Sequence, residues 1–251
     1  AEREALEMLA SHLERHGAAS HSVVRGADGR VAAFVDELSE ARIEVDAARP
    51  LWTAARVVQE DFILLTPVNV FVGGCACFSF MEIGLRGEKG NMKLGEPMTF
   101  IHRNVPGFNA ARGVGEKVAA FFKKLDAPQA RSNWLLVPEE GLDPTRYSLW
   151  DARDDGGALP LLEGASPDPR DWHLRVEFQS VSRLRESGMI LFTLHVYSDP
   201  LPSLALEPKA AAVLRQAALA LDAPHRTYRG MSDAWTDEVA AYLKGLAGAA
   251  A

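Results

Sequence analysis

The chain has 251 residues, 47% of them hydrophobic and 24% charged, so it is long enough to bury a core as one large soluble domain or two small ones. The formal net charge of −7 and the pI near 5.5 argue against a nucleic-acid-binding surface. No apolar segment reaches the roughly 18 residues that a membrane-spanning helix needs.

The N-terminal third of the chain predicts a helix, a hairpin, a second helix and two strands. Leu6, Leu9 and Leu13 share one helical face, and the resulting amphipathic pattern is not that of a signal peptide. Pro50 is well placed as the first residue of a helix. In chain order, the predicted elements are a helix at 2–16, strands at 22–25 and 31–35, a helix from Pro50 to about Asp61, and two apolar strands within 62–80 broken at Pro67.

The remainder of the chain predicts a central helix, further strands and two C-terminal helices. The central helix has an apolar side that we expect to be buried, formed by Val114, Val118, Phe121, Phe122 and Leu125. In chain order, the predicted elements are a helix at 109–125, a strand from Trp134 to Val137, a surface excursion rich in Pro, Gly and Asp at 138–170, a hairpin within 174–201, and helices at about 205–221 and 232–246.

Helices at both ends with antiparallel strands between them predict a single α+β domain over residues 1–251. Cys75 and Cys77 lie two residues apart on a predicted strand, which is incompatible with an ordinary disulfide framework and favours a reducing, cytoplasmic setting. Without further Cys or His residues nearby, the pair makes a poor zinc site. A haem thiolate and two small buried hydrophobic residues remain as alternatives.

The hairpin at 174–201 is the most informative segment of the chain. In its first strand Arg175, Glu177 and Gln179 alternate with apolar residues, and a turn ending at Gly188 follows. Such a polar row is typical of the solvated face of a half-buried sheet. The alternative is a functional row directed at a ligand.

The register of this hairpin decides whether a compact acid–base patch exists. One register places His195 opposite Glu177 and Tyr197 opposite Arg175, which gathers the polar groups on one face of the sheet. A register shifted by one residue places aliphatic residues opposite the polar row and dissolves the patch. The sequence leaves both registers open.

Two further residues are candidates for binding a cofactor. His102 lies between apolar Phe100 and Ile101 and a Val-Pro-Gly turn, so its imidazole is either a metal ligand or a hydrogen-bonded core group. Arg131 begins the segment RSNWLLV, where it either binds an anion such as a propionate or is solvated at the start of a strand.

Four separated pieces of the chain resemble one protein family. They are AARVVQEDFILL (54–65), CACFSF followed by KLGEPMTFIHRNVPGF (75–108), RSNWLLV (131–137) and LRVEFQSVSRLRESGMILFTLHVYSDPL (174–201), and the tail at 228–243 fits less specifically. In this order they resemble the haem-binding subunit of haem-dependent oxidative N-demethylases.

The resemblance implies a PAS-like fold, a b-type haem and the oxidation of a small methylated amine with O2. Dimethylamine represents the family's substrate class, and formaldehyde is a product. The resemblance further implies electrons from a separate flavin and iron–sulfur reductase fed by NADPH, and tetrahydrofolate as a formaldehyde acceptor. The apolar C-terminal helices are compatible with a homo-oligomer. A haem-based gas sensor, and an oxygenase acting on a larger biosynthetic amine, are the competing interpretations.

The resemblance also implies roles for individual residues. His102 matches the family's motif histidine, and we expect it to be the axial ligand of the iron. Arg175, Glu177 and Gln179 fall on the family's Arg-x-Glu-Arg-Gln strand, where Phe178 replaces an arginine and suggests a more apolar pocket. The expected catalytic residues are Glu177, Gln179, Arg175 and His195, and the expected cofactor contacts are His102, Arg131 and Tyr197.

Overall fold

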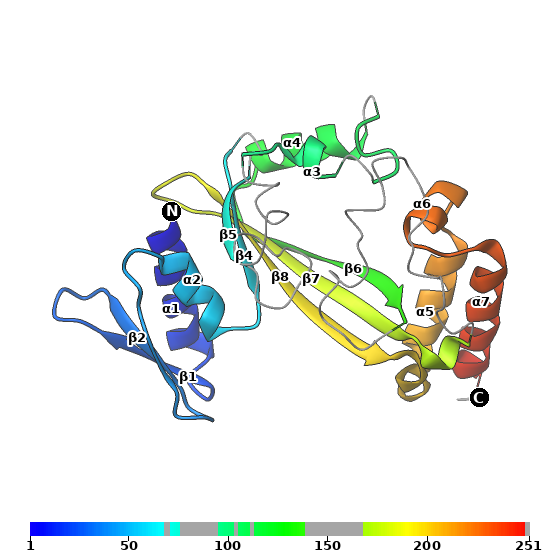
Figure 1. The fold of residues 1–251 in the computed structure, drawn as a ribbon, viewed down its shortest axis with the longest axis horizontal. Helices are drawn as coiled ribbons and strands as arrows, with labels where there is room; N and C mark the ends of the chain where they lie inside the picture. The colour runs from blue at the N-terminus through cyan, green and yellow to red at the C-terminus, as the bar shows by residue number, and fades with distance from the viewer. Residues whose placement is uncertain (68–70, 76–94, 103–104, 111–112, 139–167, 249–251) are drawn as a thin grey trace. The chain divides into compact units, whose positions relative to one another are not determined.

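The computed structural model describes residues 1–67, 71–75, 95–102, 105–110, 113–138 and 168–248, and Figure 1 traces them. These residues form an α+β arrangement, as predicted. The helices are α1 (Glu2–His16), α2 (Pro50–Val57), α3 (Met98–Ile101), α4 (Val114–Lys123), α5 (Pro208–Leu219), α6 (Ala223–Tyr228) and α7 (Asp233–Gly248). The strands are β1 (His21–Arg25), β2 (Val31–Asp36), β3 (Arg42–Glu44), β4 (Asp61–Leu65), β5 (Phe71–Cys75), β6 (Gln129–Val137), β7 (His173–Arg183) and β8 (Ile190–Pro200).

The chain divides into two compact units. Unit 1 comprises residues 1–100, 116–131 and 179–195, and unit 2 comprises residues 101–115, 132–178 and 196–251. One sheet has the strand order β1-β2-β3, and a second has the order β5-β4-β8-β7-β6. The strands β6, β7 and β8 therefore contribute residues to both units.

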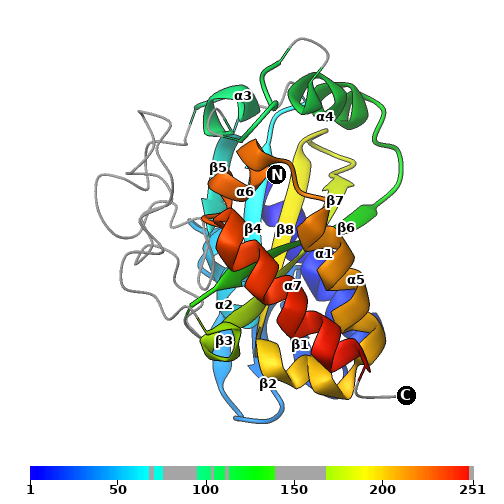
Figure 2. The same ribbon diagram turned by 90° about the vertical axis from the view of Figure 1, so that its right-hand side faces the viewer.

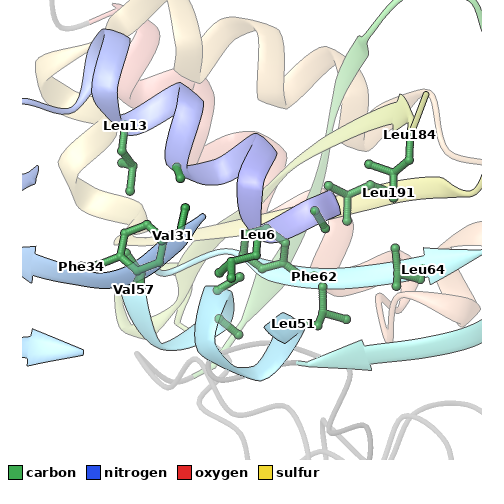
Figure 3. Packing of buried hydrophobic residues seen from close by; sticks show 14 residues of the cluster. Leu6, Leu13, Val31, Phe34, Leu51, Val57, Phe62, Leu64, Leu184 and Leu191 are labelled. Atoms are coloured by element: carbon green, nitrogen blue, oxygen red, sulfur yellow. The ribbon is translucent and has the colours of Figure 1, made fainter. Parts of the chain in front are cut away.

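Unit 1 begins with the predicted helix and hairpin. β1 pairs antiparallel with β2 in a register that places Val23 opposite Phe34, and β3 extends the sheet. Pro50 opens α2 as predicted, but α2 ends at Val57 because Asp61 already belongs to β4. Figure 3 shows the core of this unit, where α1, α2 and β2 pack with strands of the second sheet. Its labelled members are Leu6, Leu13, Val31, Phe34, Leu51, Val57, Phe62, Leu64, Leu184 and Leu191.

Unit 2 has its own core beneath the C-terminal helices. Figure 2 shows α5 and α7 side by side, and they pack against each other. Trp172 and Trp235 contact each other in this core, with ring centroids 4.1 Å apart and ring planes tilted by 43°. The sequence predicted α5 and α7 but not α6, which begins after Asp222, whose side chain accepts a hydrogen bond from the backbone N–H of His225.

The hairpin of β7 and β8 is confirmed, and its register follows from two hydrogen bonds. The backbone N–H of Leu184 donates to the carbonyl of Met189 across the turn, and the hydroxyls of Ser180 and Thr193 lie 2.6 Å apart. Gly188 occupies the turn with a φ of 69°, a conformation that favours glycine. The register is thus the shifted one, which places Val196 opposite Glu177, Leu194 opposite Gln179 and Ser198 opposite Arg175.

The prediction for the central helix was wrong in part. α4 begins at Val114 rather than at residue 109, and Val114 and Phe121 are 47% and 41% exposed, whereas Phe122 and Leu125 are buried as expected. β6 begins at Gln129, before the predicted Trp134. Cys77 and most of the predicted excursion at 138–170 lie outside the described residues. Across the described part of the chain, no helix is both long and apolar enough to cross a membrane.

Candidate functional site

The polar row of β7 is buried, so its interpretation as a solvated face was wrong. Arg175, Glu177 and Gln179 are only 2%, 7% and 8% exposed, whereas Phe178 is 44% exposed on the opposite side of the strand. Burying an ionised side chain costs several kcal/mol unless an opposite charge or hydrogen bonds compensate it. Three adjacent inward polar residues are therefore a costly arrangement and mark β7 as a candidate functional element.

Arg175 and Glu177 compensate each other within unit 2. The guanidinium Nε of Arg175 lies 3.7 Å from the carboxylate Oε1 of Glu177, and both side chains are nearly inaccessible to solvent. Since their positions differ by two residues on one strand, the side chains lie on the same face of the sheet. The pair places a buried carboxylate beside a permanent cation.

A second arginine, Arg229, contributes to the same region, and the sequence reasoning did not single it out. Its guanidinium donates hydrogen bonds to the backbone carbonyl of Trp134 and, at 3.3 Å, to the amide oxygen of Asn133, and it lies 4.8 Å from the Trp134 ring centroid. Burial lowers the pKa of Arg229, while the neighbouring Tyr228 and Glu177 raise it. The only available signal was its position in the tail at 228–243, because an arginine after a short helix has no distinctive pattern.

Gln179 and Arg131 meet in unit 1. The Nε of Arg131 donates a 2.7 Å hydrogen bond to the amide oxygen of Gln179. Arg131 is exposed, so this contact connects a buried side chain of β7 with a cation at the surface on β6. The bond also fixes the orientation of the Gln179 amide.

His195 does not join the polar row of β7. In the observed register its side chain lies on the other face of the hairpin from Glu177, and its Nδ1 lies 3.1 Å from the Oε1 of Glu60. Tyr197 lies two residues after His195 on β8, so it is on the same face of the sheet, and it is 51% exposed. The structure therefore brings Arg175 together with Glu177, and Arg131 together with Gln179. It does not bring His195 and Tyr197 to the polar row, so the predicted acid–base patch does not form.

His102 directly follows α3 in unit 2. It is half-buried, beside the buried Ile101, and its imidazole stacks on the ring of Phe108 with centroids 4.7 Å apart and an interplanar angle of 15°. The carbonyl of His102 accepts a hydrogen bond from the N–H of Val105, which closes the turn that follows. An imidazole held in this way is suitable as a ligand of a transition metal.

The described residues contain no group of three or more His, Cys, Asp and Glu side chains that could hold a bare metal ion. Haem makes a smaller demand on the protein, because the porphyrin supplies four ligands to the iron and a single imidazole completes one axial position. The half-buried His102 beside aromatic and aliphatic neighbours fits that demand. Cys75 closes β5, and Cys77 lies outside the described residues.

Comparison with known families identifies the chain. Residues 1–240 match the family described as haem-dependent oxidative N-demethylase, alpha subunit-like. The match covers the polar row of β7, His102 and Arg229. The chain belongs to this family, which associates it with haem-dependent oxidative N-demethylation and with an assembly of several subunits.

Proposed function

We propose that this member of the family is the haem-binding subunit that oxidises an amine with O2 and with electrons from a separate flavin and iron–sulfur reductase. The observation that carries the proposal is the buried row of Arg175, Glu177 and Gln179 on the strand that matches the family. A PAS-like core is part of the proposal. The second sheet has the strand order β5-β4-β8-β7-β6. If its five strands are numbered 1 to 5 in chain order, starting with β4, this order reads 2-1-5-4-3, which is the strand order of PAS domains and supports such a core.

The proposed cofactor is haem b, with His102 as axial ligand to the iron. Haem supplies the one-electron and O2 chemistry that amino-acid side chains lack. The protein contributes the position of the imidazole, which the turn at Val105 and the ring of Phe108 hold in place. Arg131, which contacts Gln179 of the polar row, remains the proposed cation for a propionate. Tyr197 is exposed on the opposite face of the hairpin, so it is no longer proposed as a cofactor contact.

Glu177 is the proposed acid–base residue of the reaction. An amine carries a positive charge at neutral pH, and in a buried site it needs a counter-charge or a proton acceptor. The Glu177 carboxylate can meet either need, while Arg175 at 3.7 Å balances its charge in the absence of substrate. Gln179, whose amide oxygen accepts a hydrogen bond from Arg131, is proposed to bind a polar group of the substrate. His195 pairs with Glu60 on the opposite face of the hairpin from Glu177, so it has no role in this proposal.

The substrate remains a methylated amine of undefined size. The apolar Phe178 lies on the other side of β7 from Glu177, so its replacement of arginine does not make the side that carries Glu177 more apolar. Phe178 therefore gives no reason to expect a bulky amine as the substrate. The reaction in balance converts an N-methyl amine, O2, two electrons and two protons into the demethylated amine, formaldehyde and water.

Oxygen consumption by the haem-reconstituted protein tests this function. The assay supplies a chemical electron donor and compares dimethylamine with a larger N-methylated amine. We expect O2 consumption that depends on one of these amines, with one formaldehyde released per demethylation. Reversible binding of O2 or CO without any amine-dependent consumption would instead identify a gas-sensing module.

A further inference from the structure

The aromatic stack of His102 and Phe108 forms part of a larger restrained unit in the segment that leads to α4. The two rings are nearly parallel, at 15°, with centroids 4.7 Å apart. Phe108 itself is only 5% exposed. The imidazole of His102 thus lies against the ring of a buried side chain.

Backbone hydrogen bonds restrain Phe108 at both its N–H and its carbonyl. Its N–H donates to the carbonyl of Val105, whose own N–H donates to the carbonyl of His102. The carbonyl of Phe108 in turn accepts a 2.9 Å hydrogen bond from the N–H of Gly115 in the first turn of α4. His102 and α4 are therefore connected through Phe108 by consecutive turns.

Gly115 allows α4 to approach Phe108 this closely. A Cβ atom on Gly115 would lie 2.9 Å from the Phe108 carbonyl oxygen and 3.0 Å from its ring atom Cε1. Since real Cβ contacts are almost never that short, any side chain at position 115 would displace Phe108. The absence of a side chain at this position keeps the Phe108 ring against His102.

We propose that Phe108 is the positioning residue that fixes the plane of the His102 imidazole, and that Gly115 acts on His102 through Phe108. This inference rests on the proposed function, because it takes His102 as the axial ligand. A histidine has a broad rotational preference about its terminal torsion, so a ligating ring needs an external restraint to keep one orientation. Many ligating histidines obtain that restraint from a hydrogen bond at the second nitrogen. The ring of Phe108, nearly parallel to the imidazole, is one such restraint on His102.

The test compares Phe108→Leu, Phe108→Tyr and Gly115→Ala with the unaltered protein after haem reconstitution. The readouts are the haem dissociation rate and the electron paramagnetic resonance spectrum of the ferric protein, which reports the orientation of an axial imidazole. We expect Phe108→Leu to accelerate haem loss at least about tenfold, the lower end for removal of a residue that orients a ligand. Phe108→Tyr keeps an aromatic ring against His102, so its haem dissociation rate and its resonance spectrum should match those of the unaltered protein.

Two matched controls separate positioning from general destabilisation. Phe121→Leu removes an aromatic ring that is 41% exposed on α4. Gly245→Ala adds a methyl group in α7 where no atom lies within 4 Å. Both should leave the haem dissociation rate and the resonance spectrum unchanged, whereas Gly115→Ala should alter them in the same direction as Phe108→Leu.

The outcomes distinguish this proposal from the proposed function. An unchanged spectrum and dissociation rate in both Phe108→Leu and Gly115→Ala, with a large change in His102→Ala, would overturn the role of Phe108 and leave the haem function intact. If Phe108→Leu does not fold, the haem dissociation rate and the resonance spectrum of Gly115→Ala alone decide whether Phe108 orients His102. If the unaltered protein takes up no haem, or if His102→Ala has no effect, both the proposed ligand and the role of Phe108 fall.

Discussion

Arg175 and Glu177 form an ion pair in the interior of unit 2, with 3.7 Å between Nε and Oε1 and with 2% and 9% of their side chains exposed. Such a pair contributes little net stability, because desolvation of both charges offsets their attraction. For this protein, the pair holds a buried carboxyl group beside a guanidinium on the strand that carries the polar row. Removing either partner leaves the other charged group buried without it, which lowers the free energy of unfolding.

The first prediction concerns the loss of Arg175. Arg175→Leu removes the guanidinium 3.7 Å from the buried Glu177 carboxylate, so we expect the free energy of unfolding to fall by about 3–5 kcal/mol. Urea denaturation followed by circular dichroism measures the change. Arg170→Met, which removes the surface partner of Asp168, is the matched control and should have little effect. Equal effects of the two substitutions would mean that the buried pair has no special role.

The second prediction concerns Glu177 and turnover. Glu177→Gln keeps the size of the side chain and removes its charge, so we expect amine-dependent O2 consumption to fall roughly 100-fold or more, the range for loss of an acid–base group. The haem content should stay the same, since the proposed axial ligand is His102. Full activity in this variant would remove Glu177 from the mechanism. Glu60→Gln changes the partner of His195 instead and tests that pair separately.

A third prediction concerns the contact between β7 and the end of α4. The guanidinium of Arg183 donates hydrogen bonds to the carbonyls of Phe122, Leu125 and Gly188. Arg183→Met removes these charged donors from the C-terminal end of the helix, and we expect a loss of roughly 2–3 kcal/mol. Hydrogen exchange should accelerate in α4 before it does in α1. Arg185→Met, at an exposed position of the same hairpin turn, is the control and should leave exchange in α4 unaltered.

The fourth prediction concerns acid sensitivity at the N-terminus. Burial raises the pKa of the Glu4 carboxyl, but hydrogen bonds from the backbone of Glu186 and from the side chain and backbone of Ser187 outweigh it, so the pKa lies below its ordinary 4.5. The carboxylate therefore stabilises the folded state above pH 4.5, and this contribution disappears as the pH falls through the lowered pKa.

Thermal unfolding at several pH values tests this link between α1 and the β7–β8 turn. Glu4→Gln should lower the melting temperature at neutral pH, and the difference from the unaltered protein should shrink as the solution is acidified through the lowered pKa of Glu4. Ser187→Ala removes one donor and should reproduce a smaller part of the effect. A difference in melting temperature that is constant with pH would contradict the role of the Glu4 charge.

The elements with strong local patterns were predictable from the sequence. α1 and the β1–β2 hairpin follow from their periodicity and their turn, and the β7–β8 hairpin follows from its alternation. The end of α2 and the start of α4 were misplaced, because competition with β4 and packing at Phe108 decide those boundaries rather than helix propensity. No periodic pattern indicates α6, which is short and begins at a cap formed by Asp222.

The candidate site was predictable only in its composition. The residue types of the polar row were visible, but alternation on a strand does not reveal which face is buried, and at Glu177 the charged face is the inner one. Likewise the register was undetermined until the Ser180–Thr193 contact fixed it. Arg229 contacts Trp134, which lies 95 positions earlier in the chain, and Phe108 stacks on His102; no periodic pattern of the sequence marks either contact.

The most direct test of the account is the ultraviolet–visible spectrum of the haem-reconstituted protein and of its His102→Ala variant. We predict a strong Soret band from stoichiometric haem in the unaltered protein, and its loss or a clear shift in the variant, with rescue by added imidazole. A Soret band unaffected by the substitution would move the ligand to another residue. The absence of haem uptake by the unaltered protein would contradict the central claim that this chain is a haem-binding catalytic subunit.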